Sequence, residues 1–290
     1  MGRLTTAVIV LACAGGFAVL ASGCGERSEP TGAAVAISYP VTVQGANEQP
    51  LEIARAPLRV LPVSASAAAL VDALGRRELV PGAPAAGQLR AFPPRAIAET
   101  SADLVVGSQA NDANALRATA AAASTPLFIL ADSSIRDLEQ SILELGLAIA
   151  APVRARSLVA AIEASRARVK AKLKGVAPVT VFVDTGYYIP IAGDTFAGEV
   201  LREAGGENIA GNADATPFPI KDLLTAGPTF YLATEASGAK LEDLRKTRRV
   251  RNLAAIREGR FAIIPLSLLQ AGPDVGEAIE QLYAILHPAP

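Results

Sequence analysis

Short runs of β-branched and aliphatic residues alternate with amphipathic stretches along most of the chain. The runs at 58–63, 78–81, 103–107 and 126–130 predict strands, and the stretches at 66–74 and 112–123 predict helices. After a long helical segment the alternation resumes, with strands over 179–183, 229–232 and 261–264 and helices over 195–204, 220–225, 241–246 and 273–286. Because strand and helix follow one another repeatedly, the pattern indicates parallel sheets with helices on their faces.

The segment 134–174 is almost wholly helical in pattern, and only Pro152 interrupts it. After Pro152 the apolar positions recur three or four residues apart, which gives one apolar face. A helix from Pro152 to Lys174 spans about 35 Å, which suits a strut between two lobes. We therefore predict an α/β fold of two Rossmann-like lobes with mostly parallel sheets joined by one long helix. Since a continuous helix resists bending, we expect only a small hinge motion between the lobes.

The first thirty residues have the layout of a secretory signal: Arg3, then an uncharged stretch from Leu4 to Gly23, then small residues before Cys24. The run Leu20-Ala21-Ser22-Gly23-Cys24 resembles the bacterial lipobox, in which the cysteine is acylated. We expect a lipid on Cys24, with an uncleaved transmembrane anchor as the alternative. Both place the rest of the chain outside the cytoplasm. The expected organisation is a signal peptide at 1–23, a flexible tether at 24–38, an N-terminal lobe at 39–133, a helical segment with the linker at 134–175 and a C-terminal lobe at 176–290.

Composition narrows the possible functions. The chain has two cysteines, one histidine and a formal net charge of −1. Outside Cys13 in the signal and Cys24 no thiol remains, so we expect no disulfide and no metal site with cysteine ligands. With a single histidine the chain is also poorly equipped for zinc. We expect no bound metal and no cofactor. His287, near the C-terminal end, is expected to be a helix-end residue. The chain lacks Ser-His-Asp, phosphate-loop and zinc-protease motifs, so we expect no enzyme. Its net charge is near zero and basic residues are not massed on one segment, so we expect no nucleic-acid partner.

Four segments, taken in order behind the lipobox, resemble a known family. They are Tyr39-Pro40-Val41-Thr42-Val43 followed by Ala56-Pro57-Leu58-Arg59-Val60; Ser101-Ala102-Asp103-Leu104-Val105-Val106; Gly193-Asp194-Thr195-Phe196 leading to Ala204-Gly205-Gly206-Glu207-Asn208-Ile209-Ala210; and Gly272-Pro273 through Leu286-His287-Pro288. Together they resemble the helical-linker (class III) solute-binding proteins of bacterial ABC transporters for ferric siderophores, haem and cobalamin. The resemblance implies a monomer that captures an iron chelate or a related corrinoid or tetrapyrrole for an ABC importer.

In open α/β sheets, ligands bind beyond the carboxyl ends of the strands. The expected ligand-binding residues lie in loops at those ends, where Arg90 offers forked donors and aromatic rings offer flat contact. The alternatives are a solvated loop arginine for Arg90, and packing beneath the linker helix for the two adjacent tyrosines. The full expected set is Pro62, Ser64, Arg90, Phe92, Ser108, Gln109, Tyr187, Tyr188, Thr234 and Gln270.

The family pattern is broken where such proteins dock on their permease. The resemblance places a glutamate on each lobe, but Ala69 stands at the first position, and Lys221, followed by Asp222, stands near the second. Asp72 and Asp222 are the candidate substitutes. The alternative function is therefore a binding or sensor protein of the cell envelope, on the same fold, that does not serve transport. The ligand's identity among siderophore, haem and cobalamin stays open.

Overall fold

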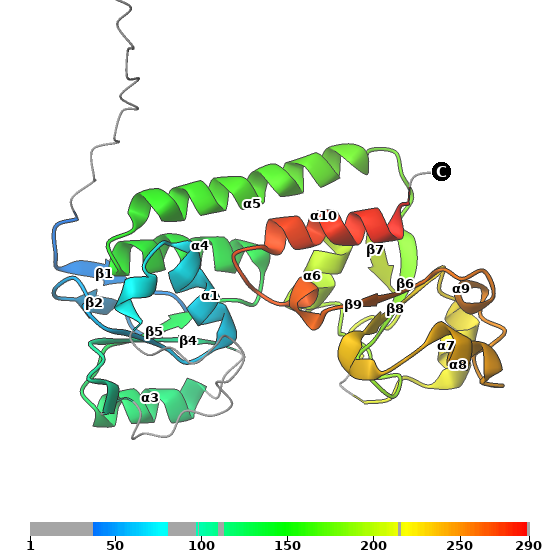
Figure 1. The fold of residues 1–290 in the computed structure, drawn as a ribbon, viewed down its shortest axis with the longest axis horizontal. Coiled ribbons are helices and arrows are strands. Elements are labelled where there is room, and N and C mark those ends of the chain that lie inside the picture. Colours follow the sequence, from blue (N-terminus) through cyan, green and yellow to red (C-terminus); the bar gives the residue numbers. More distant parts are fainter. Residues whose placement is uncertain (1–36, 81–96, 98, 110–112, 214–215, 289–290) are drawn as a thin grey trace, which may run out of the picture. The chain divides into compact units, whose positions relative to one another are not determined.

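Two parallel sheets, each flanked by helices, make up the computed structural model of this protein (Figure 1). The structure describes residues 37–80, 97, 99–109, 113–213 and 216–288. Residues 35–290 form one compact unit. The predicted class, two α/β lobes with mostly parallel sheets joined by a long helix, is confirmed.

The N-terminal lobe holds a three-stranded parallel sheet in the order β3-β4-β5. Its strands are β3 (Val60–Pro62), β4 (Leu104–Ser108) and β5 (Leu127–Leu130). A separate antiparallel pair, β1 (Val41–Val43) and β2 (Leu51–Ile53), precedes it. The flanking helices are α1 (Ala65–Ala73), the 3-10 turn η1 (Arg77–Leu79), α3 (Ala113–Ala122) and α4 (Ile135–Ala148).

Both faces of this sheet are buried, which explains why its strands carry no polar side chain before Ser108, the last residue of β4. Alternate side chains point to opposite faces of a strand. Val106 and Phe128 therefore join the core cluster on the side of α1 and α4, whereas Val105 and Ile129 join a second cluster that contains Leu116 of α3.

The C-terminal lobe holds a four-stranded parallel sheet in the order β7-β6-β8-β9. Its strands are β6 (Val179–Asp184), β7 (Gly206–Asn208), β8 (Phe230–Thr234) and β9 (Phe261–Ile264). The helices are α6 (Phe196–Glu203), α7 (Ile220–Ala226), η2 (Glu235–Ser237), α8 (Leu241–Lys246), α9 (Ala254–Arg257), η3 (Leu266–Leu269) and α10 (Val275–Leu286).

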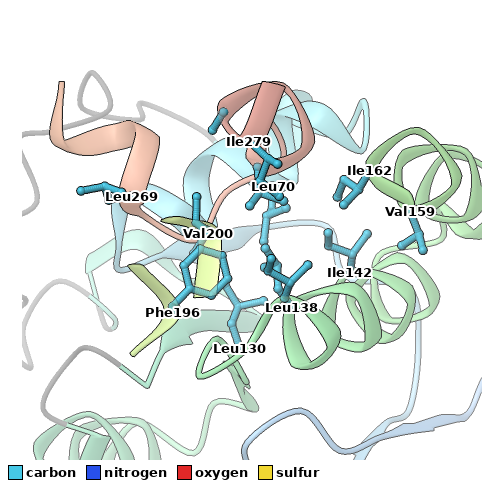
Figure 2. Close-up of a cluster of buried hydrophobic side chains, with 14 of the residues drawn as sticks. Leu70, Leu130, Leu138, Ile142, Val159, Ile162, Phe196, Val200, Leu269 and Ile279 are labelled. Atoms are coloured by element: carbon cyan, nitrogen blue, oxygen red, sulfur yellow. The ribbon is translucent and has the colours of Figure 1, made fainter. Parts of the chain in front are cut away.

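The long helix α5 (Pro152–Lys172) begins with proline in its first turn, where a missing N–H is harmless. It contacts α4, which flanks the N-terminal sheet, and α10 of the C-terminal lobe. One core cluster continues through these helices into both lobes, as Figure 2 shows with Leu70 and Leu130 from the N-terminal lobe and Val200 and Ile279 from the C-terminal lobe. The linker is therefore part of a shared core rather than a bare strut.

Most predicted elements have their counterpart within a few residues, and one is wrong. The segment 78–81 was expected to be a strand, but Arg77–Leu79 forms a 3-10 turn. Gly75, at φ +70°, ends α1. The N–H groups of Leu79 and Val80 then donate to the carbonyls of Arg76 and Arg77, three residues back, which is the pattern of a 3-10 turn. No helix in the described part of the chain is long and apolar enough to cross a membrane.

Candidate functional site

Several polar side chains gather at the carboxyl ends of β3, β4 and β5 in the N-terminal lobe. The hydroxyl of Ser64, directly after β3, caps α1 by accepting a hydrogen bond from the Ala67 N–H at 3.1 Å. The Ser66 hydroxyl lies 3.1 Å from it. Pro62 is buried at the end of β3. Ser64 is thus a helix cap first, and its contribution to a ligand site rests on its remaining hydrogen-bonding capacity.

Asp132 lies just beyond β5, and the side chains of Ser108 and Gln109 converge on it. The buried hydroxyl of Ser108, the last residue of β4, donates to Asp132 Oδ2. The Gln109 side-chain oxygen accepts from the Asp132 backbone N–H at 3.2 Å. Burial raises the pKa of the Asp132 carboxyl, and the hydrogen bond from Ser108 opposes that rise. The Asp132 carboxylate is thus held in place at the carboxyl end of the N-terminal sheet, where its oxygens can accept hydrogen bonds.

The loop after β6 carries the two adjacent tyrosines. Tyr187 has φ +55° and Tyr188 has φ +61°, in the left-handed region where side chains other than glycine and asparagine are strained. Tyr187 is 89% exposed, so its ring is presented outward. Two successive residues in this region cost on the order of 1 kcal/mol each or more, and such strain is concentrated at functional sites.

Tyr188 has a different environment. Its ring packs on a cluster in the C-terminal lobe that includes Phe182, Leu223 and Tyr231. Burial raises the pKa of the Tyr188 phenol, the Asp184 carboxylate adds to the rise, and Arg249 opposes it. Neither tyrosine packs beneath the linker helix, which was the alternative to a position at the strand ends.

Two further expected residues lie at the ends of β8 and β9. Thr234 closes β8 and is 1% exposed, and its hydroxyl has no hydrogen-bond partner among the described residues. Gln270 follows η3 and is exposed, with its N–H donating to the Ser267 carbonyl at 3.2 Å. Thr234 therefore brings an unused polar group to the strand end, and Gln270 a free amide.

Several expected residues lie elsewhere. Arg90, Phe92 and Cys24 fall outside the described residues. Ala69 is half-buried on α1, whereas Lys221 and Asp222 are exposed in the first turn of α7. The missing glutamate charge at position 69 has no nearby replacement on α1 except Asp72, which is 3.5 Å from Arg77.

The sequence pattern did not single out Asp132 and Asp184. Asp132 accepts a hydrogen bond from Ser108 in the N-terminal lobe, and Asp184 binds the loop after β6 in the C-terminal lobe. Asp184 is 4% exposed, and its Oδ1 accepts hydrogen bonds from the N–H groups of Gly186 (2.8 Å) and Tyr188 (3.0 Å). The sequence did carry a mark of both: Asp184 ends an apolar strand and Asp132 stands two residues after one, where a short carboxylate can bind the backbone of the next turn.

Three surface hollows formed by described residues lie away from these strand ends. A groove of about 640 Å³ runs between α5 and α10, next to the ion pair of Arg168 with Glu280. Two smaller ones, of about 360 and 350 Å³, lie near Asp103 and near Gly206. The described residues hold no cluster of three or more His, Cys, Asp or Glu side chains suited to a metal ion.

Comparison with known proteins identifies the fold and the family. Solved structures with the same fold include the periplasmic haem-binding protein RhuT from Roseiflexus sp. RS-1 in apo form, with a TM-score of 0.70 at 23% identity over 79% of this chain and 97% of that one. The vitamin B12-binding protein BtuF of Vibrio cholerae gives a TM-score of 0.67 at 16% identity over 79% and 96%. CeuE of Helicobacter pylori in a Ni-His complex gives 0.72 at 14% identity over 86% and 88%.

A search of curated proteins found no match. Residues 96–268, more than half of the chain, match the model of the family described as "Periplasmic binding protein". That family consists of solute-binding proteins rather than enzymes, and membership implies a location outside the cytoplasm. The resemblance noted in the sequence is confirmed, and this chain belongs to the periplasmic binding protein family.

Proposed function

We propose that this protein is a lipid-anchored, extracytoplasmic solute-binding protein that captures a ferric chelate or a metal-tetrapyrrole at the carboxyl ends of its strands. The observation that carries the proposal is Tyr187, 89% exposed on a strained loop at the end of β6. A phenol ring offers a flat apolar surface, and its oxygen is a ligand for ferric iron in some haem proteins. The structural relatives, a haem-binding protein, a vitamin B12-binding protein and a protein in complex with nickel, support the same ligand class.

Both lobes contribute polar groups suited to orienting such a ligand. Gln109 and Gln270 are exposed amides at the ends of β4 and of η3, and Thr234 adds a buried hydroxyl without a partner among the described residues. A few placed polar groups on an apolar surface are typical of small-molecule sites. We expect Arg90 and Phe92 to complete the site.

A thermal-shift series with the mature domain tests this proposal. Haemin, cyanocobalamin and the ferric complex of desferrioxamine B are added separately, because a ligand that binds only the folded state raises the melting temperature. At a ligand concentration 100 times the dissociation constant, the folded state gains about 2.7 kcal/mol. We expect one probe to raise the melting temperature, and Tyr187→Ala to reduce that rise. The absence of a shift with all three probes would contradict the ligand class.

The lipid anchor has its own test. Wild-type protein should incorporate labelled fatty acid. It should also fractionate with membranes, because an acyl chain contributes about 0.8 kcal/mol of membrane-binding free energy per buried methylene group. Cys24→Ala should incorporate none and lose membrane association if cleavage still occurs. Equal labelling of both proteins would exclude Cys24 as the acylated residue.

A second candidate function, binding without transport, is favoured by Ala69 and Lys221 at the expected docking positions. Uptake of the identified ligand by host cells with and without this protein separates the two. If cells without the protein lose uptake, the protein delivers its ligand to an ABC importer, with Asp72 or Asp222 in place of the usual glutamates. Unchanged uptake in cells without the protein supports a store or sensor role.

A further inference from the structure

The side chain of Asp184 is buried in the C-terminal lobe, where it accepts hydrogen bonds from the loop it precedes and from Tyr231 of β8. It is 4% exposed, and among the described residues no cation forms an ion pair with it. Oδ1 accepts from the N–H groups of Gly186 and Tyr188, and Oδ2 accepts from the Tyr231 hydroxyl at 2.6 Å. A buried carboxylate without a cation is stabilised by such donors. The two hydrogen bonds from Gly186 and Tyr188 also fix the backbone of the loop.

The loop that Asp184 precedes has a positive φ at three successive residues, and the conformation is strained at the two that are not glycine. Gly186 has φ +136°, and Tyr187 and Tyr188 follow in the left-handed region. The turn closes through the Thr185 N–H to the Ile189 carbonyl (2.8 Å) and the Ile189 N–H to the Gly186 carbonyl (2.9 Å). Tyrosine gains nothing locally from this backbone conformation, so the conformation persists because the surroundings impose it. The two N–H groups that flank Tyr187 both point at one Asp184 oxygen.

Tyr231 fixes Asp184 from the neighbouring strand β8. Its ring is fully buried and lies 5.5 Å from the Phe182 ring and 6.0 Å from the Phe261 ring, centroid to centroid. Burial raises the pKa of the Tyr231 phenol strongly, and the nearby Asp184 carboxylate adds to the rise. The phenol therefore stays protonated and donates to Asp184 at any physiological pH. Figure 1 shows β6 and β8 side by side in the sheet that carries this pair.

We propose that Asp184 and Tyr231 are positioning residues for ligand binding: they hold the 185–190 loop so that Tyr187 is presented in a fixed orientation without touching the ligand themselves. This inference rests on the proposed role of Tyr187. Pre-organising a contact before binding raises affinity, because less conformational entropy is lost when the ligand arrives. Ligand affinity in this protein is then set partly by two side chains buried behind the site.

The test uses Asp184→Ala, Asp184→Asn and Tyr231→Phe in the mature protein, with Asp243→Ala, an exposed aspartate on α8, as the matched control. The first readout is amide hydrogen exchange at Gly186 and Tyr188 without ligand. The second is the dissociation constant for haemin and for ferric desferrioxamine B, titrated separately. Amides in β4 report whether the fold as a whole is intact.

We expect Asp184→Ala to speed exchange at both amides by about tenfold or more while exchange in β4 stays unchanged. The dissociation constant for the probe that wild type binds should rise by about tenfold, toward that of Tyr187→Ala. Asp184→Asn keeps an acceptor oxygen for the two N–H groups and should restore most of the protection and affinity. Tyr231→Phe, which removes one hydroxyl, keeps the variant set interpretable if Asp184→Ala does not fold.

Unchanged exchange at Gly186 and Tyr188 in Asp184→Ala overturns the inference. So does faster exchange with unaltered affinity, provided that Tyr187→Ala weakens binding. If wild type binds neither of these probes nor cyanocobalamin, the proposed ligand class fails. The exchange data still decide in that case: faster exchange supports the positioning of the loop, and unchanged exchange refutes it.

Discussion

Arg166, on the linker helix α5, binds one carboxylate from each lobe. Its guanidinium donates to Glu139 of α4 at 2.9 Å and to both carboxylate oxygens of Glu203 of α6 at 2.8 and 3.0 Å. All three side chains are largely buried, at 26%, 13% and 28% exposed. Forked, charge-assisted bonds of this kind are strong and directional. One side chain therefore ties together helices from both lobes.

Replacing this arginine should destabilise the whole unit. Arg166→Met keeps the aliphatic stem but leaves two half-buried carboxylates without a cation, and we expect a loss of about 1–3 kcal/mol, below the fully buried case because water still screens the group. Denaturant unfolding measures it. Arg168→Met removes the more exposed pair with Glu280 and should cost less than about 1 kcal/mol. Equal losses of unfolding free energy in the two variants would show that Arg166 does not stabilise the protein by joining helices of both lobes.

The loss in Arg166→Met should also depend on pH. Burial raises the pKa of Glu139 in the folded protein, and Arg166 opposes that rise. Without Arg166 the rise becomes larger, so the folded state binds the proton more tightly than the unfolded state does. Stability of the variant then falls as pH increases from the usual glutamate pKa of 4.5 through the raised value. We expect the difference from wild type to be small at pH 4 and larger at pH 7.

At the scale of elements, two glycines let the linker helix approach its neighbours. A Cβ on Gly146 of α4 would lie 2.4 Å from Ala155 Cβ of α5, and one on Gly276 of α10 would lie 2.9 Å from Ser165 Cβ of α5. Close-packed interiors leave no room for an extra methyl group at such distances. Glycine is accepted here against its poor helix propensity because it allows this contact.

Gly146→Ala should therefore destabilise the protein although alanine is the better helix former. Because the new methyl group would lie only 2.4 Å from Ala155 Cβ, we expect overpacking to cost about 2–3 kcal/mol, which exceeds the propensity gain of about 1 kcal/mol. Thermal or denaturant unfolding provides the measurement. Adding Ala155→Gly removes the opposing methyl group and should restore part of the loss. A Gly146→Ala variant more stable than wild type would show that α4 and α5 do not pack so closely.

Local chemistry explains which elements were predictable. Ser64 and Thr195 each accept from a backbone N–H three residues on, so the starts of α1 and α6 were marked by their caps. Strand β7 was missed because Gly206-Glu207-Asn208 has low strand propensity, and only pairing with β6 extends it. Helix α9 is four residues long, too short for a periodic pattern to reveal.

The candidate site was predictable by position more than by mechanism. The rule that ligands bind at strand ends located Ser108, Tyr187 and Thr234, because the strands themselves were visible in the pattern. It did not reveal Asp184, whose partner Tyr231 is 47 residues away on a neighbouring strand. Pairing of β6 with β8 brings the two together, and sequence spacing carries no trace of it.

At the scale of the whole molecule, the continuous core limits relative motion of the lobes. Residues of α4, α5, α6 and α10 belong to one buried cluster, and Glu199 of α6 accepts from the Ile135 N–H at the start of α4 at 2.9 Å. A hinge that opened widely would expose this shared core, at about 25 cal/mol per Å² of apolar surface. Ligand binding should therefore proceed with small rearrangements.

Solution scattering tests that expectation. We expect the radius of gyration to change by less than about 1 Å when the ligand is added, in line with pre-organised binding proteins. Arg166→Met, which removes the clamp between the helices, should widen the change. A large compaction of the wild type on binding would show that the lobes move independently.

The most direct test of the central claim, that ligand is held at the carboxyl ends of the strands by the Tyr187 loop, is a crystal structure of the complex with the probe that raises the melting temperature. The account predicts a ligand in contact with the Tyr187 ring and near the ends of β4, β6 and β8, with the left-handed loop unchanged. A ligand seated instead in the groove between α5 and α10, or a loop that refolds around it, would contradict the account.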